Sequence, residues 1–227
     1  MKRTGLILTA SILLSCTSAF GANIKVEDGV SAPNSDYNSV NKSVQIGRDA
    51  EIGDIDSVNG AIRVGSGALV KNIESVNGSV KLRSGASVNA IEVVNGSIDL
   101  ESDVIVSQSV ESVNGRIRTN QGVTIGEDVK TVNGGIDMTG TTVQGSVETY
   151  NGDLELVNTE VLGDLRVTKS KGWGWNRKKS KPNQIVIGAN TVIHGDLYFE
   201  KPVKLTVHPS ATVGEIFGEE VQRGDMR

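Results

Sequence analysis

Aliphatic residues recur at every sixth position over much of the chain. The residues two positions before several of them are also aliphatic or small, as at Ile62, Ala68, Val80, Ala86, Ile98 and Val104. This alternation predicts short strands that bury one face. A chance origin for the uninterrupted series has a probability on the order of 10⁻⁷. The series comprises Val40, Ile46, Ile52, Val58, Val64, Val70, Val76, Leu82, Val88, Val94, Leu100 and Val106.

A longer repeat contains three of these six-residue units. An asparagine, usually within Val-Asn-Gly, returns every 18 or 19 residues, at Asn41, Asn59, Asn77, Asn95, Asn114, Asn133 and Asn151. In the later repeats the register shifts by one, and Val113, Ile125, Val132, Met138, Tyr150 and Leu156 are the expected core residues. Three strands per repeat predict an all-β, single-stranded parallel β-helix. We expect a β-solenoid of triangular cross-section, with coils of 18–19 residues.

The Asn-Gly pairs fall between the predicted strands. Both residue types tolerate left-handed backbone angles, so we expect them to form a sharp corner. Asparagines at one corner of successive coils can also form a hydrogen-bonded ladder along the stack. The repeated asparagines are therefore interpreted as structural.

One basic segment interrupts the repeat at residues 169–184. It contains both tryptophans of the chain and no acidic residue, whereas the whole chain has a net charge of −4. Cations attract phosphate and carboxylate groups, and tryptophan stacks on sugars or settles at membrane interfaces. The segment is either a tolerated insertion at a coil corner or a binding loop. The candidate polyanion-binding residues are Lys169, Lys171, Trp173, Trp175, Arg177, Lys178, Lys179 and Lys181.

The repeat resumes after this segment, at Ile187, Ile193, Phe199, Leu205, Ala211 and Phe217. The segment is therefore an insertion between coils of one domain. We expect an N-terminal cap at residues 22–39 and β-helix coils at 40–168. The insertion at 169–184 is followed by final coils at 185–217 and a charged C-terminal tail at 218–227.

The first 21 residues read as a signal peptide. Lys2 and Arg3 precede an apolar stretch at residues 5–14, which is too short to span a membrane as a helix. Ala19 to Gly21 resemble the small-x-small site of signal peptidase, and cleavage there would remove Cys16, the one cysteine of the chain. Alternatively, Cys16 ends a lipoprotein-like sequence and is a candidate lipidation site. Either reading predicts export to the periplasm, the outer membrane or the cell surface.

The coil sequence ESVNGSVKLRSGASV, at residues 74–88, resembles two groups of proteins. One is the polymer-forming bactofilin β-helices, and the other is the secreted, adhesin-like β-helix repeat proteins with tandem VNG coils. The resemblance covers residues 38–168 and, more loosely, 185–217. It implies a parallel β-helix of right-handed sense and brings no catalytic residues. Bactofilins are cytoplasmic, whereas this chain carries an export signal.

Enzymatic alternatives have few candidate residues. Hexapeptide β-helix acyltransferases use a histidine base, for which His194 and His208 are the candidates. Polysaccharide-cleaving β-helices use clustered carboxylates, for which Asp99, Asp137, Asp153 and Glu155 are the candidates. No phosphate loop, dinucleotide fingerprint or metal-spaced Cys/His set is present, so no cofactor or metal is expected.

We therefore predict a non-enzymatic cell-envelope rod or surface-binding module. Its expected partner is an anionic envelope polymer or a membrane surface. The same interactions would bind nucleic acid, but export favours lipopolysaccharide, peptidoglycan or an exopolysaccharide as the polyanion, so we do not expect nucleic acid as a partner. The alternatives are a self-assembling bactofilin-like or adhesin-like element and an enzyme acting on carbohydrate or acyl substrates.

Overall fold

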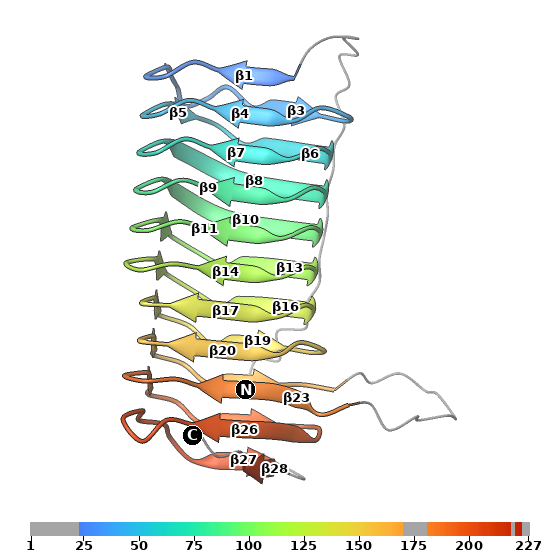
Figure 1. Cartoon of the computed structure of the whole chain (residues 1–227). Helices are drawn as coiled ribbons and strands as arrows, with labels where there is room; N and C mark the ends of the chain where they lie inside the picture. The colour runs from blue at the N-terminus through green and yellow to red at the C-terminus, as the bar shows by residue number, and fades with distance from the viewer. Residues whose placement is uncertain (1–22, 170–180, 219–220, 224–227) are drawn as a thin grey trace, which may run out of the picture.

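The computed structural model describes residues 23–169, 181–218 and 221–223. These residues form a β-solenoid of about ten coils, stacked along one axis (Figure 1). Every strand pairing is parallel, and the described residues contain no helix. Successive coils contribute strands to three sides in turn, which confirms the predicted all-β parallel solenoid. Its right-handed sense stays a prediction.

The first sheet follows one side of the solenoid and has eleven strands. Its strands come from every coil, including the coils on either side of the insertion. The order is β1 (Ile24–Val26), β4 (Val44–Ile46), β7 (Ile62–Val64), β9 (Val80–Leu82), β11 (Ile98–Leu100), β14 (Ile117–Thr119), β17 (Ile136–Thr139), β20 (Leu154–Val157), β23 (Asn183–Ile187), β26 (Val203–Val207) and β28 (Val221–Arg223).

The second and third sheets cover the other two sides and share two long strands, β8 (Leu69–Asn77) and β10 (Ser87–Asn95), which continue around a corner. The second sheet also contains β2 (Ser31–Ala32), β5 (Glu51–Ile52), β12 (Ile105–Val106), β15 (Thr124–Ile125), β18 (Thr142–Val143), β21 (Glu160–Val161) and β24 (Val192–Ile193). The third contains β3 (Tyr37–Ser39), β6 (Ile55–Asn59), β13 (Val110–Asn114), β16 (Val129–Asn133), β19 (Val147–Thr149), β22 (Leu165–Val167), β25 (Leu197–Phe199) and β27 (Ile216–Gly218).

The six-residue series predicts the core correctly on the first two sheets and wrongly on the third. Ile46, Ile52, Val64 and Val70 are buried, as are their equivalents in the next two coils. On the third sheet the valines of Val-Asn-Gly, such as Val58 and Val76, are only half-buried. The inward positions there are instead occupied by Ile55, Ile73, Ile91, Val110, Val129, Val147, Leu165 and Leu197, each followed two residues later by a second inward residue.

The physical reason is a change of parity at the corner before the third sheet. Successive inward residues are two apart within a strand, but Ile52 and Ile55 are three apart. The inward set therefore moves from even to odd positions and returns after the Asn-Gly pair, at Ile62. As a result Ser57 points inward and Val58 does not. The Ser57 hydroxyl is buried without a hydrogen-bond partner among the described residues.

The asparagines form the predicted ladder along the corner between the third and first sheets, here called the Asn-Gly corner. The side-chain nitrogen of each donates to the side-chain oxygen of the asparagine one coil earlier, over 2.8–3.0 Å, from Asn59 to Asn151. The adjoining glycines are needed for a reason other than the predicted one. Of those in the Asn-Gly pairs, Gly60 alone has a positive φ, 146°. Elsewhere the glycines stack so closely that a β-carbon on Gly96 would overlap the carbonyl oxygen of Gly78.

Left-handed backbone angles occur instead at the corner between the first and second sheets, here called the left-handed corner. One residue per coil has φ between 49° and 81° there. Each is glycine, aspartate or asparagine, the residues that tolerate this conformation. They are Gly29, Asp49, Gly67, Gly85, Asp103, Gly122, Gly140, Asn158 and Asn190.

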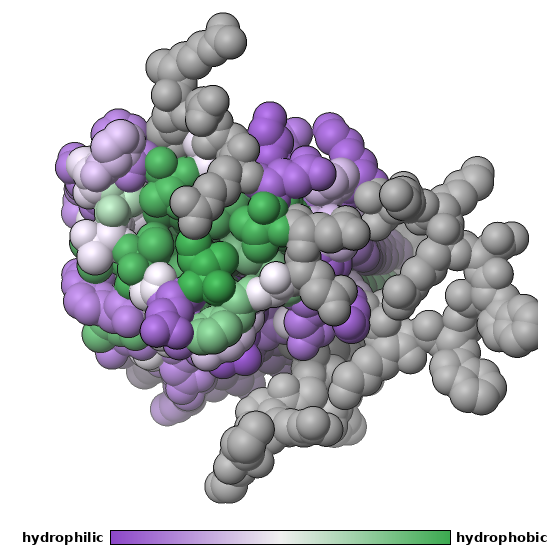
Figure 2. Space-filling model, turned by 90° about the horizontal axis from the view of Figure 1, so that it is seen from below, coloured by the Kyte–Doolittle hydropathy of each residue, from purple (hydrophilic) through white to green (hydrophobic). Residues whose placement is uncertain are grey.

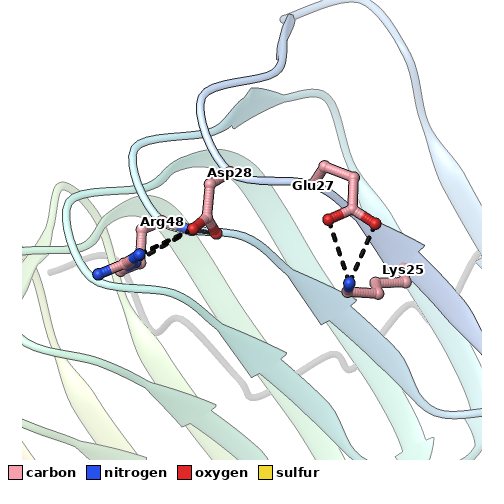
Figure 3. Close-up of polar contacts among 4 residues, drawn as sticks. All are labelled: Lys25, Glu27, Asp28 and Arg48. Carbon is pink, nitrogen blue, oxygen red and sulfur yellow. Dashed lines mark hydrogen bonds and ion pairs between the residues drawn. The ribbon is translucent and has the colours of Figure 1, made fainter.

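Residues at both ends of the described chain belong to the solenoid. The segment predicted as a cap contains β1, β2 and β3, which pair in register with the second coil. Polar pairs line this end: Lys25 pairs with Glu27 at 3.0 Å, and Asp28 with Arg48 at 3.0 Å (Figure 3). At the other end, β28 lies within the segment predicted as a charged tail and pairs with β26.

Candidate functional site

The basic insertion replaces one Asn-Gly corner. It lies between β22 and β23, and the register pairs Leu154 with Ile185, so this coil advances by 31 residues instead of 18 or 19. Lys169 and Lys181 are exposed at its two ends. The remaining candidates, Lys171, Trp173, Trp175, Arg177, Lys178 and Lys179, lie outside the described residues. So do Cys16 and the predicted signal peptide.

Hydrogen bonds to neighbouring coils hold both ends of the insertion. On the entering side, the backbone N–H of Lys169 donates to the Glu200 carboxylate over 3.2 Å. On the leaving side, the backbone N–H of Gln184 donates to the Asp153 carboxylate over 2.7 Å, and the Asn183 side chain donates to the carbonyl oxygen of Gly152. The solenoid therefore keeps its register across the insertion and fixes where the basic segment emerges.

Lys201 closes the asparagine ladder where the insertion interrupts it. Its ammonium donates to the carbonyl oxygen of Tyr150 and, over 3.0 Å, to the side-chain oxygen of Asn151. That oxygen would otherwise accept from an asparagine in the next coil. Burial lowers the pKa of the Lys201 ammonium. Sequence reasoning missed Lys201, because the contact joins residues 50 positions apart, on either side of the insertion.

A stack of rings lies on the third sheet beside the insertion. The Arg166 guanidinium lies 4.9 Å from the centroid of the Tyr198 ring. The other face of Tyr198 stacks on Phe217, with centroids 5.2 Å apart and planes inclined by 12°. Arg166 pairs with Asp164 in addition. This part of the sheet therefore combines aromatic and cationic groups close to the base of the basic segment.

The same sheet is strongly acidic nearer the N-terminus. Asp56, Glu74, Glu92 and Glu111 occupy one outward column and follow one another in register. We call this column the acidic ladder. Burial, reinforced by neighbouring carboxylates, raises the pKa of Asp56 and Glu74. Burial also raises the pKa of Glu111, although Lys130 opposes the shift.

The two histidines are not brought together. His194 follows β24 and its Nε2 lies 2.9 Å from the Glu160 carboxylate. His208 follows β26, at the left-handed corner, with its Nδ1 2.8 Å from the Ser210 hydroxyl. The two side chains therefore stand at different corners of the solenoid, each with its own polar partner.

Three of the four candidate carboxylates do lie in one column of the first sheet. Asp99, Asp137 and Glu155 belong to it, whereas Asp153 precedes β20 and accepts from Gln184. Arg118 stands between Asp99 and Asp137, at 3.8 and 3.5 Å. Asp99 and Arg118, together with Lys81 and Glu101, border an open depression of about 490 Å³. Asp99 and Asp137 are thus held in ion pairs.

No family model, curated protein or solved structure matches the chain significantly. Within residues 23–169, 181–218 and 221–223, no helix is long and apolar enough to cross a membrane. Within the same ranges, no three or more His, Cys, Asp or Glu side chains are grouped so that they could hold a metal ion.

Proposed function

We propose that the chain is a non-enzymatic rod of the cell envelope, exported by its N-terminal segment, whose basic insertion contacts an anionic polymer or membrane. The observation that carries the proposal is that register is kept on both sides of the insertion. This coil has about thirteen more residues than its neighbours, and hydrogen bonds hold the described residues at both ends of the insertion. A rigid scaffold that presents a charged loop is a common arrangement for binding.

The chemistry of the insertion supports an anionic partner. Its cations would neutralise phosphates or carboxylates, and its two indole rings would stack on sugars or enter a lipid interface. The Arg166–Tyr198–Phe217 stack beside its base adds a cation and ring surface of the same character. Lipopolysaccharide, peptidoglycan and anionic lipid are the partners expected of an exported protein.

Co-sedimentation of the mature protein with these three partners tests the proposal. The matched variant lacks residues 169–181 and carries Pro182→Asn and Asn183→Gly, which restores an 18-residue coil with an Asn-Gly corner. A second variant keeps both tryptophans and replaces the six cations by serine. We expect salt-sensitive binding by the wild type, weak binding by the serine variant and none by the deletion variant. Equal binding by all three proteins would reject the loop as the contact.

A second candidate function is end-to-end self-assembly, as the resemblance to bactofilins suggests. Supporting it, apolar side chains gather at the C-terminal end of the rod (Figure 2). Ile216 and Phe217 are 36% and 42% exposed, and Val207, Ala211 and Val213 are only partly buried. Light scattering of the wild type and of a Phe217→Ser variant would test this. Assembly that persists at high salt and is lost in the variant would favour it, and a monomeric wild type would exclude it.

A further inference from the structure

Two outer faces of the rod carry opposite charge at similar heights. The acidic ladder lies on the third sheet, from β6 to β13. On the first sheet, Arg63, Lys81 and Arg118 occupy the outward column of β7, β9 and β14, interrupted by Asp99 in β11. Arg83 and Arg116 flank that column, so cations outnumber carboxylates there. We call this region the basic face; the Asn-Gly corner separates it from the acidic ladder.

The described residues leave the acidic ladder largely without ion pairs. Asp56, Glu74 and Glu92 form no ion pair with any described residue, and Glu111 reaches Lys130 only at 3.9 Å. Asp54 and Asp36 add negative charge beside Asp56. Like charges that stand directly opposite on neighbouring strands repel each other. A cationic surface laid against the ladder would relieve this repulsion.

The cations of the basic face are either unpaired or only weakly paired among the described residues. The Arg63 side chain is exposed and forms no ion pair or hydrogen bond with a described residue. Lys81 pairs with Glu101 at 3.0 Å, at an exposed position where such pairs contribute little. Arg118 is shared between two carboxylates at 3.5 Å or more. These cations can turn toward a new partner at small cost.

We propose that the acidic ladder of one copy docks against the basic face of a second copy, with the two rods side by side and parallel. Both columns repeat at the strand spacing of about 4.8 Å, so their charges can be matched coil by coil. With the two rods at the same height, Arg63 of one copy lies opposite Asp56 of the other, Lys81 opposite Glu74 and Arg118 opposite Glu111, because strands such as β6 and β7 lie at one level (Figure 1). The same alignment places Asp137 opposite Lys130. Asp99 opposite Glu92 is the one like-charged pair among these five.

A second copy fits this surface better than an unrelated polycation, because it presents its cations at the same repeat distance. The two faces differ, so the contact is heterologous, and a dimer keeps one acidic ladder and one basic face free. Association would therefore continue beyond a dimer into lateral arrays. Neither face includes the basic insertion or the apolar C-terminal end. The proposal therefore does not depend on either candidate function.

Sedimentation velocity of two charge-reversed variants tests the proposal. Arg63→Glu with Lys81→Glu disables the basic face, and Asp56→Lys with Glu74→Lys disables the acidic ladder. Wild type is expected to associate at low salt and to dissociate at high salt, because salt screens exposed charges. Each variant alone is expected to be monomeric. Their equimolar mixture is expected to associate again, because the unchanged ladder of one variant meets the unchanged basic face of the other and the two reversed faces are also complementary.

A monomeric wild type at low salt would overturn the proposal, as would a mixture that stays monomeric. Association that survives high salt, or that persists in either variant alone, would also overturn it and would indicate the apolar end instead. Circular dichroism verifies that the variants fold. If a reversal prevents folding, the neutral variants Arg63→Gln and Glu74→Gln replace it. Each should weaken wild-type association about two- to fivefold, and unchanged association would contradict the contact.

Discussion

The Asn-Gly corner and the left-handed corner contain the same kinds of residue for different physical reasons. At the Asn-Gly corner, successive glycines lie in close contact, and a β-carbon on Gly96 would overlap the carbonyl oxygen and carbon of Gly78. At Gly85, in the left-handed corner, there is room for a side chain, since a β-carbon there would meet nothing nearer than the backbone nitrogen of Gly67 at 3.8 Å. Its φ of 74°, however, is unfavourable for most residues. Contact between coils restricts one corner, and backbone handedness restricts the other.

The largest effect is expected at the Asn-Gly corner. Gly96→Ala places a methyl group where the neighbouring coil already lies, so the coils must separate or the corner must shift. We expect a loss of about 3 kcal/mol in the free energy of unfolding, as for other overpacked sites. Urea unfolding measures it, with Gly85→Ala as the matched control. A cost no greater than that of Gly85→Ala would show that contact does not distinguish the two corners.

The asparagine ladder gives the next largest effect. Asn95→Ala removes a donor to Asn77 and an acceptor for Asn114, whereas Asn41→Ala at the end of the ladder removes one acceptor. Each exposed hydrogen bond is worth about 0.5–1.5 kcal/mol. We expect Asn95→Ala to lower the urea midpoint about twice as much as Asn41→Ala. Equal shifts would argue that the ladder does not act through its bonds.

A smaller effect is expected at the left-handed corner. Gly85→Ala should lower the free energy of unfolding by about 1 kcal/mol. The left-handed conformation is unfavourable for alanine, although there is room for its methyl group. Gly85→Asn should cost less, because asparagine visits this region readily and already occupies it at Asn158 and Asn190. Thermal unfolding of the two variants compares these costs. An asparagine variant less stable than the alanine variant would contradict the handedness argument.

The smallest effect is expected at the acidic ladder. Stacked asparagines bond to one another, whereas stacked glutamates repel one another, so removing one negative charge should stabilise the fold. The pKa of Glu74 is raised in the folded protein, so deprotonation destabilises the fold. The contribution of Glu74 to the stability of the fold is fully present below the pKa that this group has in the unfolded chain. It is lost as the pH rises through the pKa of the group in the folded protein. Glu74→Gln should therefore stabilise the protein at pH 7, by about 0.5 kcal/mol after solvent screening, and change little at pH 3. Unfolding across this pH range measures it, and a variant less stable at pH 7 would refute the repulsion.

The fold can be predicted from the sequence because the chain is periodic. Each repeat of 18 or 19 residues has similar residues in its strands and at its corners. The sequence predicts the inward residues of the first two sheets, such as Ile46 and Val70. The six-residue series predicts the wrong inward residues for the third sheet. The series continues through Val58 without interruption, so it gives no sign that the inward residues change from even to odd positions after Ile52. The column of Ile55, Ile73 and Ile91, spaced 18 residues apart, is the signal that would have revealed the inward set.

The candidate site is less predictable than the fold. The boundaries of the basic insertion follow from the interrupted repeat, and Lys169 and Lys181 are exposed at its ends as expected for a loop. The acidic ladder could also have been found, since Glu74, Glu92 and Glu111 hold the same place in successive repeats. The contact of Lys201 with Asn151 could not, because it joins residues 50 positions apart that the repeat does not bring into register.

Tryptophan fluorescence tests the central claim most directly. The two tryptophans of the chain, Trp173 and Trp175, both lie in the basic insertion, so their emission reports on that segment alone. The mature protein would be titrated with vesicles containing anionic lipid, with lipopolysaccharide and with neutral vesicles. The proposed function predicts a blue shift with at least one anionic partner that high salt reverses, and no shift with neutral vesicles. Unchanged emission in a sample where the protein sediments with an anionic partner would contradict it and would place the contact on the faces of the rod.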